Sequence, residues 1–132
     1  IAHGVLVAEE MGKPFIYVRS APKSHGLSNQ VEGVCKKGAK VVVIEDLVST
    51  GGSSLNAVEA LRDAGCEVLG MVAIFTYGFP AAAETFAKAG VKLDTLSNYE
   101  TLIPLAIEQG YVEASDLETL KEWRRDPAGW KK

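Results

Sequence analysis

The sequence predicts an α/β fold, in which a parallel sheet is flanked by helices, and two observations support this prediction. Between residues 41 and 96, apolar segments rich in β-branched residues alternate with segments of helical character. Gly65 and Gly90 each stand between an expected helix and the next expected strand, where glycine commonly ends a helix. A strand–helix–strand–helix–strand order is typical of a parallel sheet whose helices pack over it as right-handed crossovers.

The segment ahead of this unit is expected to contribute a helix, a short strand and a loop. Residues 1–11 have the pattern of a helix end closed by Gly12, and residues 15–18 form an apolar run typical of a buried strand. Residues 19–29 are polar and lack periodicity, so we expect a flexible loop there. Residues 30–36 alternate weakly, which is compatible with an edge strand.

The central unit is expected to contain three strands and two helices. Apolar, mostly β-branched runs mark the strands. Apolar residues at every third position mark the first helix, and an alanine-rich run behind a proline marks the second. In chain order, these elements are the strand 41–46, the helix 53–64, the strand 68–75, the helix 80–89 and the strand 91–96.

Two short helices are expected after the sheet. Ser97-x-x-Glu100 and Ser115-x-x-Glu118 both match the capping box, in which side chains satisfy the first free N–H groups of a helix. Trp123 and Trp130 are expected to be packing anchors. The neighbouring Arg124 and Arg125 are expected to form a solvated helix end.

Composition indicates one ordinary globular domain, residues 1–132. The chain is 47% hydrophobic and 23% charged, which is close to the usage of globular proteins. Its net charge of −3 arises from scattered charges, so we expect neither a nucleic-acid groove nor a membrane surface. The apolar runs are too short to cross a bilayer.

Two further features concern the cellular context. Cys35 and Cys66 lack the CxxC spacing of metal and redox motifs, so we expect reduced thiols in a cytoplasmic protein. The chain begins at Ile1 within an apolar, helix-like stretch, without Met and without a signal sequence. We therefore expect it to be an N-terminally truncated domain.

The most informative stretch runs from Val41 to Ser53. An apolar strand ends in Glu45 and Asp46, and a Ser/Thr/Gly turn then leads into the helix. A glycine turn at a helix N-terminus stabilises a phosphate through its backbone N–H groups and the helix dipole. Adjacent carboxylates suit hydroxyl groups or a divalent cation, so the stretch predicts a phosphorylated sugar as ligand. Neither the Walker A pattern nor the dinucleotide-binding glycine pattern occurs here.

A second constellation lies in the loop that precedes this stretch. Arg19, Lys23 and His25 place three potential cations within seven residues. A mobile cationic loop suits a polyanion that is covered during chemistry and released afterwards. On composition alone, a merely solvated basic loop is an equally good interpretation.

Together these motifs resemble a known family. Residues 41–53 resemble the phosphoribosyl pyrophosphate motif of the type I phosphoribosyltransferases, and Arg19-x-x-x-Lys23-x-His25-Gly26 resembles the flexible catalytic loop of the orotate phosphoribosyltransferases. The resemblance extends along the chain to the closing Asp126-Pro127-x-x-Trp130. It implies a type I phosphoribosyltransferase fold. It also implies transfer of the phosphoribosyl group from phosphoribosyl pyrophosphate to orotate, giving orotidine 5′-phosphate and pyrophosphate.

The resemblance also implies residue roles. Glu45 and Asp46 would bind the ribose hydroxyls, with Asp46 counted among the catalytic residues. Arg19, Lys23 and His25 would contact the pyrophosphate, the last two as catalytic residues. The remaining substrate-binding residues would form the strand end and the phosphate-binding turn, namely Leu47, Val48, Ser49, Thr50, Gly51, Gly52 and Ser53.

Cofactor and partner follow from the same resemblance. Mg²⁺ would be held mainly by substrate oxygens, with no ligand directly from the protein. The chain would act as a homodimer in which the loop 19–26 reaches into the partner's site.

Two positions depart from the family pattern. Ser20 stands where many relatives have a lysine, and Tyr77 where many have an arginine that pairs with the orotate carboxylate. Tyr77 would either donate one hydrogen bond to the base or form an apolar wall.

Two alternatives remain at this point. A purine-type phosphoribosyltransferase shares the motif at residues 41–53, although the loop from Arg19 to Gly26 disfavours it. A regulatory protein that only senses phosphoribosyl pyrophosphate would keep the same phosphate site. The cationic pair Lys23 and His25 argues against a sensor, because sensing does not require cations that stabilise a transition state.

Overall fold

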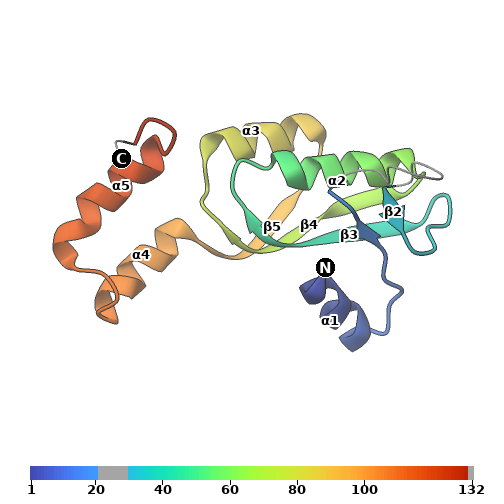
Figure 1. Cartoon of the computed structure of the whole chain (residues 1–132), viewed down its shortest axis with the longest axis horizontal. Helices are drawn as coiled ribbons and strands as arrows, with labels where there is room; N and C mark the ends of the chain where they lie inside the picture. The colour runs from blue at the N-terminus through green and yellow to red at the C-terminus, as the bar shows by residue number, and fades with distance from the viewer. Residues whose placement is uncertain (21–29, 131–132) are drawn as a thin grey trace.

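The computed structural model describes residues 1–20 and 30–130. Its centre is a parallel sheet of three strands in the order β3-β4-β5 (Figure 1). The strands span Lys40–Val48, Glu67–Thr76 and Leu93–Asn98, respectively. The predicted α/β fold with a parallel sheet is therefore confirmed, and each strand lies within three residues of its predicted position.

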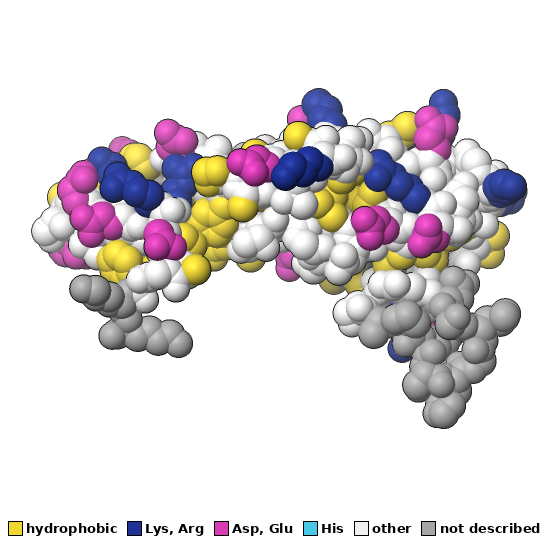
Figure 2. Space-filling model, turned by 90° about the horizontal axis from the view of Figure 1, so that it is seen from above, with side chains coloured by type: hydrophobic (Ala, Val, Ile, Leu, Met, Phe, Trp, Pro, Cys, Tyr) yellow, Lys and Arg dark blue, Asp and Glu magenta, His cyan; other side chains and the backbone are white. Residues whose placement is uncertain are grey.

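Two helices cover one face of this sheet (Figure 1). They are α2, Gly52–Asp63, and α3, Pro80–Ala89. The main core lies between these helices and the strands and is built from Val48, Leu55, Val58, Met71, Ala73, Ala82, Phe86 and Val91. Positively and negatively charged side chains are interspersed over the outer surface on this side (Figure 2).

The other face of the sheet is less well covered. Helix α1, Ala2–Glu10, lies on this side and packs near β3 (Figure 1). Apolar residues from all three strands stay exposed, with Val42 at 51%, Ile74 at 40% and Leu96 at 78% of their full surface. The sequence makes both faces of these strands apolar, but only the face toward α2 and α3 is buried in the main core.

A second, smaller sheet pairs β1, Tyr17–Val18, with β2, Val31–Glu32, in antiparallel orientation. Both strands are shorter than the predicted runs 15–18 and 30–36. Val31 packs with Leu61 and Cys66 in a separate apolar cluster. The small sheet therefore lies against the C-terminal half of α2 and the start of β4.

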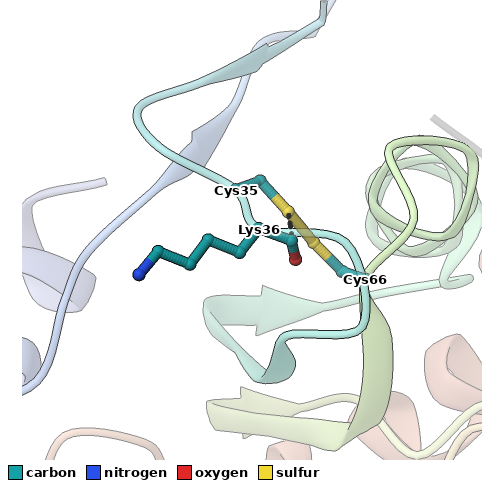
Figure 3. Close-up of a disulfide and its surroundings, with 3 residues drawn as sticks. All are labelled: Cys35, Lys36 and Cys66. Carbon is teal, nitrogen blue, oxygen red and sulfur yellow. Dashed lines mark hydrogen bonds between the residues drawn. A yellow bond between two sulfur atoms is a disulfide. The ribbon is translucent and has the colours of Figure 1, made fainter.

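The two cysteines are joined, which contradicts the expectation of reduced thiols. Cys35 and Cys66 form a disulfide across 31 residues of sequence, with Cα atoms 7.0 Å apart (Figure 3). Cys35 follows β2, and Cys66 immediately precedes β4. Sequence spacing carries no sign of this pairing, because the packing of the small sheet against the end of α2 creates it.

The chain ends in an arm at the carboxyl end of the sheet (Figure 1). It consists of α4, Tyr99–Glu108, a short 3₁₀ turn, Ala114–Asp116, and α5, Leu117–Arg125. Within residues 1–20 and 30–130, no helix is both long and apolar enough to cross a membrane.

Both predicted capping boxes in this arm were wrong. Ser97 pairs with Phe75 inside β5, so the strand continues one residue further and Asn98 becomes the cap. The Asn98 side chain accepts a hydrogen bond from the Thr101 amide at 2.9 Å. Ser115 lies inside the 3₁₀ turn, and α5 begins two residues later.

Candidate functional site

The two acids of the central motif lie near the end of β3, as predicted, and the strand continues for two residues beyond them to Val48. Glu45 Oε1 accepts a hydrogen bond from Ser54 Oγ at 2.6 Å. Ser54 lies in the first turn of α2 and is only 2% exposed. Glu45 is therefore held on the face of the sheet that α2 covers.

Asp46 has a different environment. Its Oδ1 accepts a hydrogen bond from the Leu47 amide at 2.7 Å, and the residue is exposed to solvent. Successive side chains of a strand point to opposite faces, so the two carboxylates flank the strand end instead of forming one pair. Both remain able to accept hydrogen bonds from hydroxyl groups.

The turn after β3 is shaped by Gly51. This residue is buried, has φ +88° and is the N-cap of α2. A Cβ at this position would lie 2.7 Å from the Phe86 ring, so only glycine permits the close packing of the turn on α3. Because the N-cap has no side chain, it leaves the first N–H groups of α2 available. A helix N-terminus of this kind is a site for an anionic group.

The turn is tied to the neighbouring loop between β4 and α3. Val48 is fully buried, and its carbonyl oxygen accepts hydrogen bonds from Thr76 Oγ1 at 3.0 Å and from the Tyr77 amide at 3.3 Å. The Gly78 amide in turn donates to Thr76 Oγ1 at 3.1 Å. The two loops at the carboxyl end of the sheet therefore form one connected structure, where ligands of parallel α/β sheets usually bind.

The Tyr77 side chain belongs to an aromatic cluster. Its ring centre lies 5.3 to 6.0 Å from those of four other rings, Phe75, Phe79, Tyr99 and Trp123. Trp123 also contacts Phe79 and Tyr99, which confirms its predicted role as a packing anchor, whereas Trp130 is 39% exposed. Burial raises the pKa of Tyr99 above its usual value, the Arg124 charge opposes this, and Tyr77 adds to it.

Arg124 is not the solvated helix end that was predicted. Its Nε donates to the Tyr77 carbonyl oxygen at 2.9 Å and its Nη2 to the Gly78 carbonyl oxygen at 3.3 Å. Its Nη1 lies 3.8 Å from Glu100 Oε2. The C-terminal helix is thus connected to the β4–α3 loop, 47 residues away in sequence.

The predicted pyrophosphate-binding residues are only partly described. Lys23 and His25 lie outside the described residues. Arg19 Nη1 lies 3.5 Å from Glu32 Oε1, and Gln30 brackets the Arg19 backbone through two hydrogen bonds. Arg19 directly follows β1, whose small sheet packs near the C-terminal half of α2, whereas the glycine turn is at the N-terminal end of α2. The described contacts do not bring Arg19 together with Glu45 and Asp46.

Comparison with known proteins identifies the class to which this fold and site belong. Residues 4–103 match the family model of the phosphoribosyl transferase domain. The chain therefore belongs to the phosphoribosyl transferase domain family. The resemblance inferred from residues 41–53 is confirmed at this level.

Individual relatives narrow the comparison. The chain is 60% identical over 130 residues to the orotate phosphoribosyltransferase of Phocaeicola vulgatus, an alignment that covers 98% of this chain and 61% of the relative. The crystal structure of orotate phosphoribosyltransferase from Aeropyrum pernix matches with a TM-score of 0.68 and 33% identity, over 82% of this chain and 58% of the other. Leishmania donovani UMP synthase matches with a TM-score of 0.75 and 29% identity, over 91% and 26%. This chain spans about three fifths of the length of the curated relatives that it matches.

Two residues at this site were missed by sequence reasoning. Ser54 had a weak signal, since it sits on the first helical turn directly after a motif that ends a strand in acids. Arg124 had none, because its contacts depend on where the C-terminal arm packs. A local sequence pattern can identify only residues that are close to one another along the chain. Arg124 could not be found in this way because its partners belong to another element.

Proposed function

We propose that this chain carries the phosphoribosyl-transferring site of an orotate phosphoribosyltransferase. The reaction transfers the phosphoribosyl group of phosphoribosyl pyrophosphate to orotate, which yields orotidine 5′-phosphate and pyrophosphate. The observation that carries the proposal is the arrangement from Glu45 to Ser54. The Glu45 carboxylate at the end of β3 accepts a hydrogen bond from the Ser54 hydroxyl in the first turn of α2. The N-cap of α2 is a glycine, Gly51. The 60% identity to a relative named for this activity supports the choice of orotate.

Each part of the arrangement has a chemical role in the proposal. The turn 49–53 binds the 5′-phosphate through backbone N–H groups, since the N-terminal end of α2 favours negative charge. Glu45 and Asp46 accept hydrogen bonds from the ribose hydroxyls. The Ser54 hydroxyl fixes the Glu45 carboxylate before the sugar arrives, which reduces the ordering that binding requires.

Cations would promote the departure of pyrophosphate. The anomeric carbon gains positive character as its bond to the leaving oxygen breaks, and the leaving group gains negative charge. Arg19, Lys23 and His25 would stabilise this charge more strongly in the transition state than in the ground state. The pair Lys23 and His25 would act across a dimer interface, in the site of the second subunit.

Mg²⁺ is the cofactor that the proposal includes. The carboxylates of Glu45 and Asp46 are hard oxygen donors of the kind that Mg²⁺ prefers, and Asp46 is exposed. Within residues 1–20 and 30–130, no three His, Cys, Asp or Glu side chains are grouped as a metal site. Substrate oxygens would therefore supply most of its ligands, and the bound ion would neutralise charge on the pyrophosphate. We also place the protein in the cytoplasm, with the nucleotide-forming enzymes that it resembles.

The test is pyrophosphate release from phosphoribosyl pyrophosphate and Mg²⁺ with orotate, adenine or hypoxanthine added separately. We expect release with orotate alone. Lys23→Ala should lower kcat about a hundredfold or more, the loss typical of removing a group that stabilises transition-state charge. Binding of ribose 5-phosphate, measured by calorimetry, should largely survive because it uses the turn 49–53.

Three results would count against the proposal. Turnover with a purine base would indicate a purine-type phosphoribosyltransferase. Binding of phosphoribosyl pyrophosphate without turnover of any base, in both this chain and a chain of full relative length, would indicate a sensor. Unchanged turnover in Lys23→Ala would remove the role of the cationic loop. Turnover only in the longer chain would leave the proposed chemistry intact and locate the missing part of the site.

A further inference from the structure

We infer that Arg124 is a positioning residue for the nucleobase side of the site. By clamping the loop 76–79 it would set the affinity for a carboxylate-bearing base. The inference rests on the proposed function, in which a base binds beside the sugar phosphate at the carboxyl end of the sheet, where the loop 76–79 lies next to Val48. Four observations support it, three on the contact between α5 and the loop after β4 and one on the link from that loop to Val48.

The first observation is the geometry of the clamp. The Arg124 guanidinium donates to two consecutive carbonyl oxygens, those of Tyr77 at 2.9 Å and Gly78 at 3.3 Å. A planar guanidinium presents its N–H groups in a fixed fork, so two bonds to neighbouring carbonyls restrain the orientation of the peptide between them. Lysine, with one flexible ammonium, cannot reproduce this restraint.

The second observation is the glycine at the clamp. Gly78 has φ +66°, and a Cβ there would lie 2.8 Å from Arg124 Nη2. The loop backbone thus approaches the guanidinium as closely as a residue without a side chain permits. Any larger residue at position 78 would both strain the backbone and displace the arginine.

The third observation is the linkage to the phosphate-binding turn. The same loop is bonded to the Val48 carbonyl through the Tyr77 amide and through Thr76 Oγ1. Val48 immediately precedes the turn 49–53. The loop that Arg124 holds therefore stands at a defined position relative to the place where the sugar phosphate would bind.

The fourth observation concerns charge. Tyr77 brings no charge to this wall, and its ring is engaged with four other rings. Arg124 brings a permanent positive charge to the same loop, with a side chain 31% exposed. Its nearest acidic group, Glu100, is 3.8 Å away and 81% exposed, so solvent weakens that pairing. A fixed cation next to the loop favours a base that carries a carboxylate over a neutral purine.

The experiment compares three variants with the parent in a chain that shows orotate turnover. Arg124→Met removes both the fork and the charge, and Arg124→Lys keeps only the charge. Arg125→Met is the matched control, since Arg125 is the next residue of α5 and is exposed. We expect Arg124→Met to raise the KM for orotate about tenfold, the scale of a lost hydrogen bond to a charged group, and to leave the KM for phosphoribosyl pyrophosphate within about twofold. Arg124→Lys should lie between Arg124→Met and the parent, and Arg125→Met should match the parent.

Hydrogen exchange of the Tyr77 and Gly78 amides gives a readout that does not depend on turnover. Exchange should accelerate in Arg124→Met and remain unchanged in Arg125→Met, because only the former releases the loop. Unchanged exchange in Arg124→Met would overturn the inference, as would an equal rise in KM for both substrates. If no chain turns over orotate, the proposed function fails first. Fluorescence titration of orotate in a Trp130→Phe background, where Trp123 is the one remaining tryptophan, then decides whether Arg124→Met weakens base binding.

Discussion

Ser54 Oγ donates a hydrogen bond of 2.6 Å to Glu45 Oε1 and so joins the first turn of α2 to the end of β3. The bond spans nine residues of sequence and encloses the whole turn 49–53. Ser54 is nearly fully buried, whereas Glu45 is only partly so. The hydroxyl therefore acts from inside the core on a carboxylate that faces the site. It fixes one of the two carboxylate oxygens.

Ser54→Ala should weaken binding of phosphoribosyl pyrophosphate by about tenfold. A hydrogen bond to a charged group contributes roughly 1.5–3 kcal/mol, and partial hydration of Glu45 reduces this toward the lower end. The effect should appear as a raised KM for phosphoribosyl pyrophosphate with the KM for orotate little changed. Steady-state kinetics with each substrate varied in turn measures both.

A double-mutant cycle shows whether this effect runs through Glu45. In the background Glu45→Gln, adding Ser54→Ala should cost distinctly less than it does in the parent, because the two residues act as one unit. Fully additive losses would mean that Ser54 acts independently of Glu45.

Gly51→Ala should destabilise the fold by about 2–5 kcal/mol. The residue has φ +88°, a region that costs an L-residue roughly 1–2 kcal/mol, and its new Cβ would lie 2.7 Å from the Phe86 ring. Gly52→Ala is the matched control, since nothing lies within 4 Å of a Cβ there. It should change stability by no more than about 1 kcal/mol. Urea midpoints of the two variants provide the comparison, and equal midpoints would contradict the role assigned to Gly51.

Stability should fall at alkaline pH because of Tyr99. Burial, the largest cause, raises its pKa above the ordinary tyrosine value of 10.0, so the folded protein holds the phenolic proton more tightly than the unfolded chain does. The resulting stability is fully present below pH 10 and is lost as pH rises through the higher folded-state pKa. Tyr99→Phe should flatten this part of the pH profile, at the cost of the hydrogen bond from Tyr99 to the Leu120 carbonyl. Tyr111→Phe, at an 85% exposed tyrosine, should leave the profile unchanged in urea unfolding from about pH 8 to about pH 11.

Reduction of the Cys35–Cys66 disulfide should lower stability by up to about 3–4 kcal/mol. The bridge closes a loop across 31 residues, and its loss restores freedom to the unfolded chain. The midpoint of urea unfolding should therefore drop on adding a reductant in the parent but not in the double variant Cys35→Ser/Cys66→Ser. Two free thiols in the untreated folded protein would contradict the bridge.

The order of elements and the glycine turn before α2 could be predicted from sequence because both depend on local chemistry. Side-chain periodicity separates the strands 41–46 and 68–75 from the helices between and after them. Glycine then marks the ends of those helices through its freedom in φ. The turn after Glu45 was found in the same way, since its acids, its glycine and the helix that follows are neighbours in the chain.

Only the tertiary structure decided which distant groups meet. Because β5 pairs with β4 as far as Asn98, the helix cap is Asn98 and not the predicted Ser97. The packing of the small sheet brought Cys35 to Cys66, and the course of the C-terminal arm brought Arg124 to Tyr77. Such contacts depend on how surfaces from separate elements fit together. A single sequence shows which residues each element exposes but not which elements pack together. Each such contact becomes favourable only when the rest of the core has fixed the positions of its two partners.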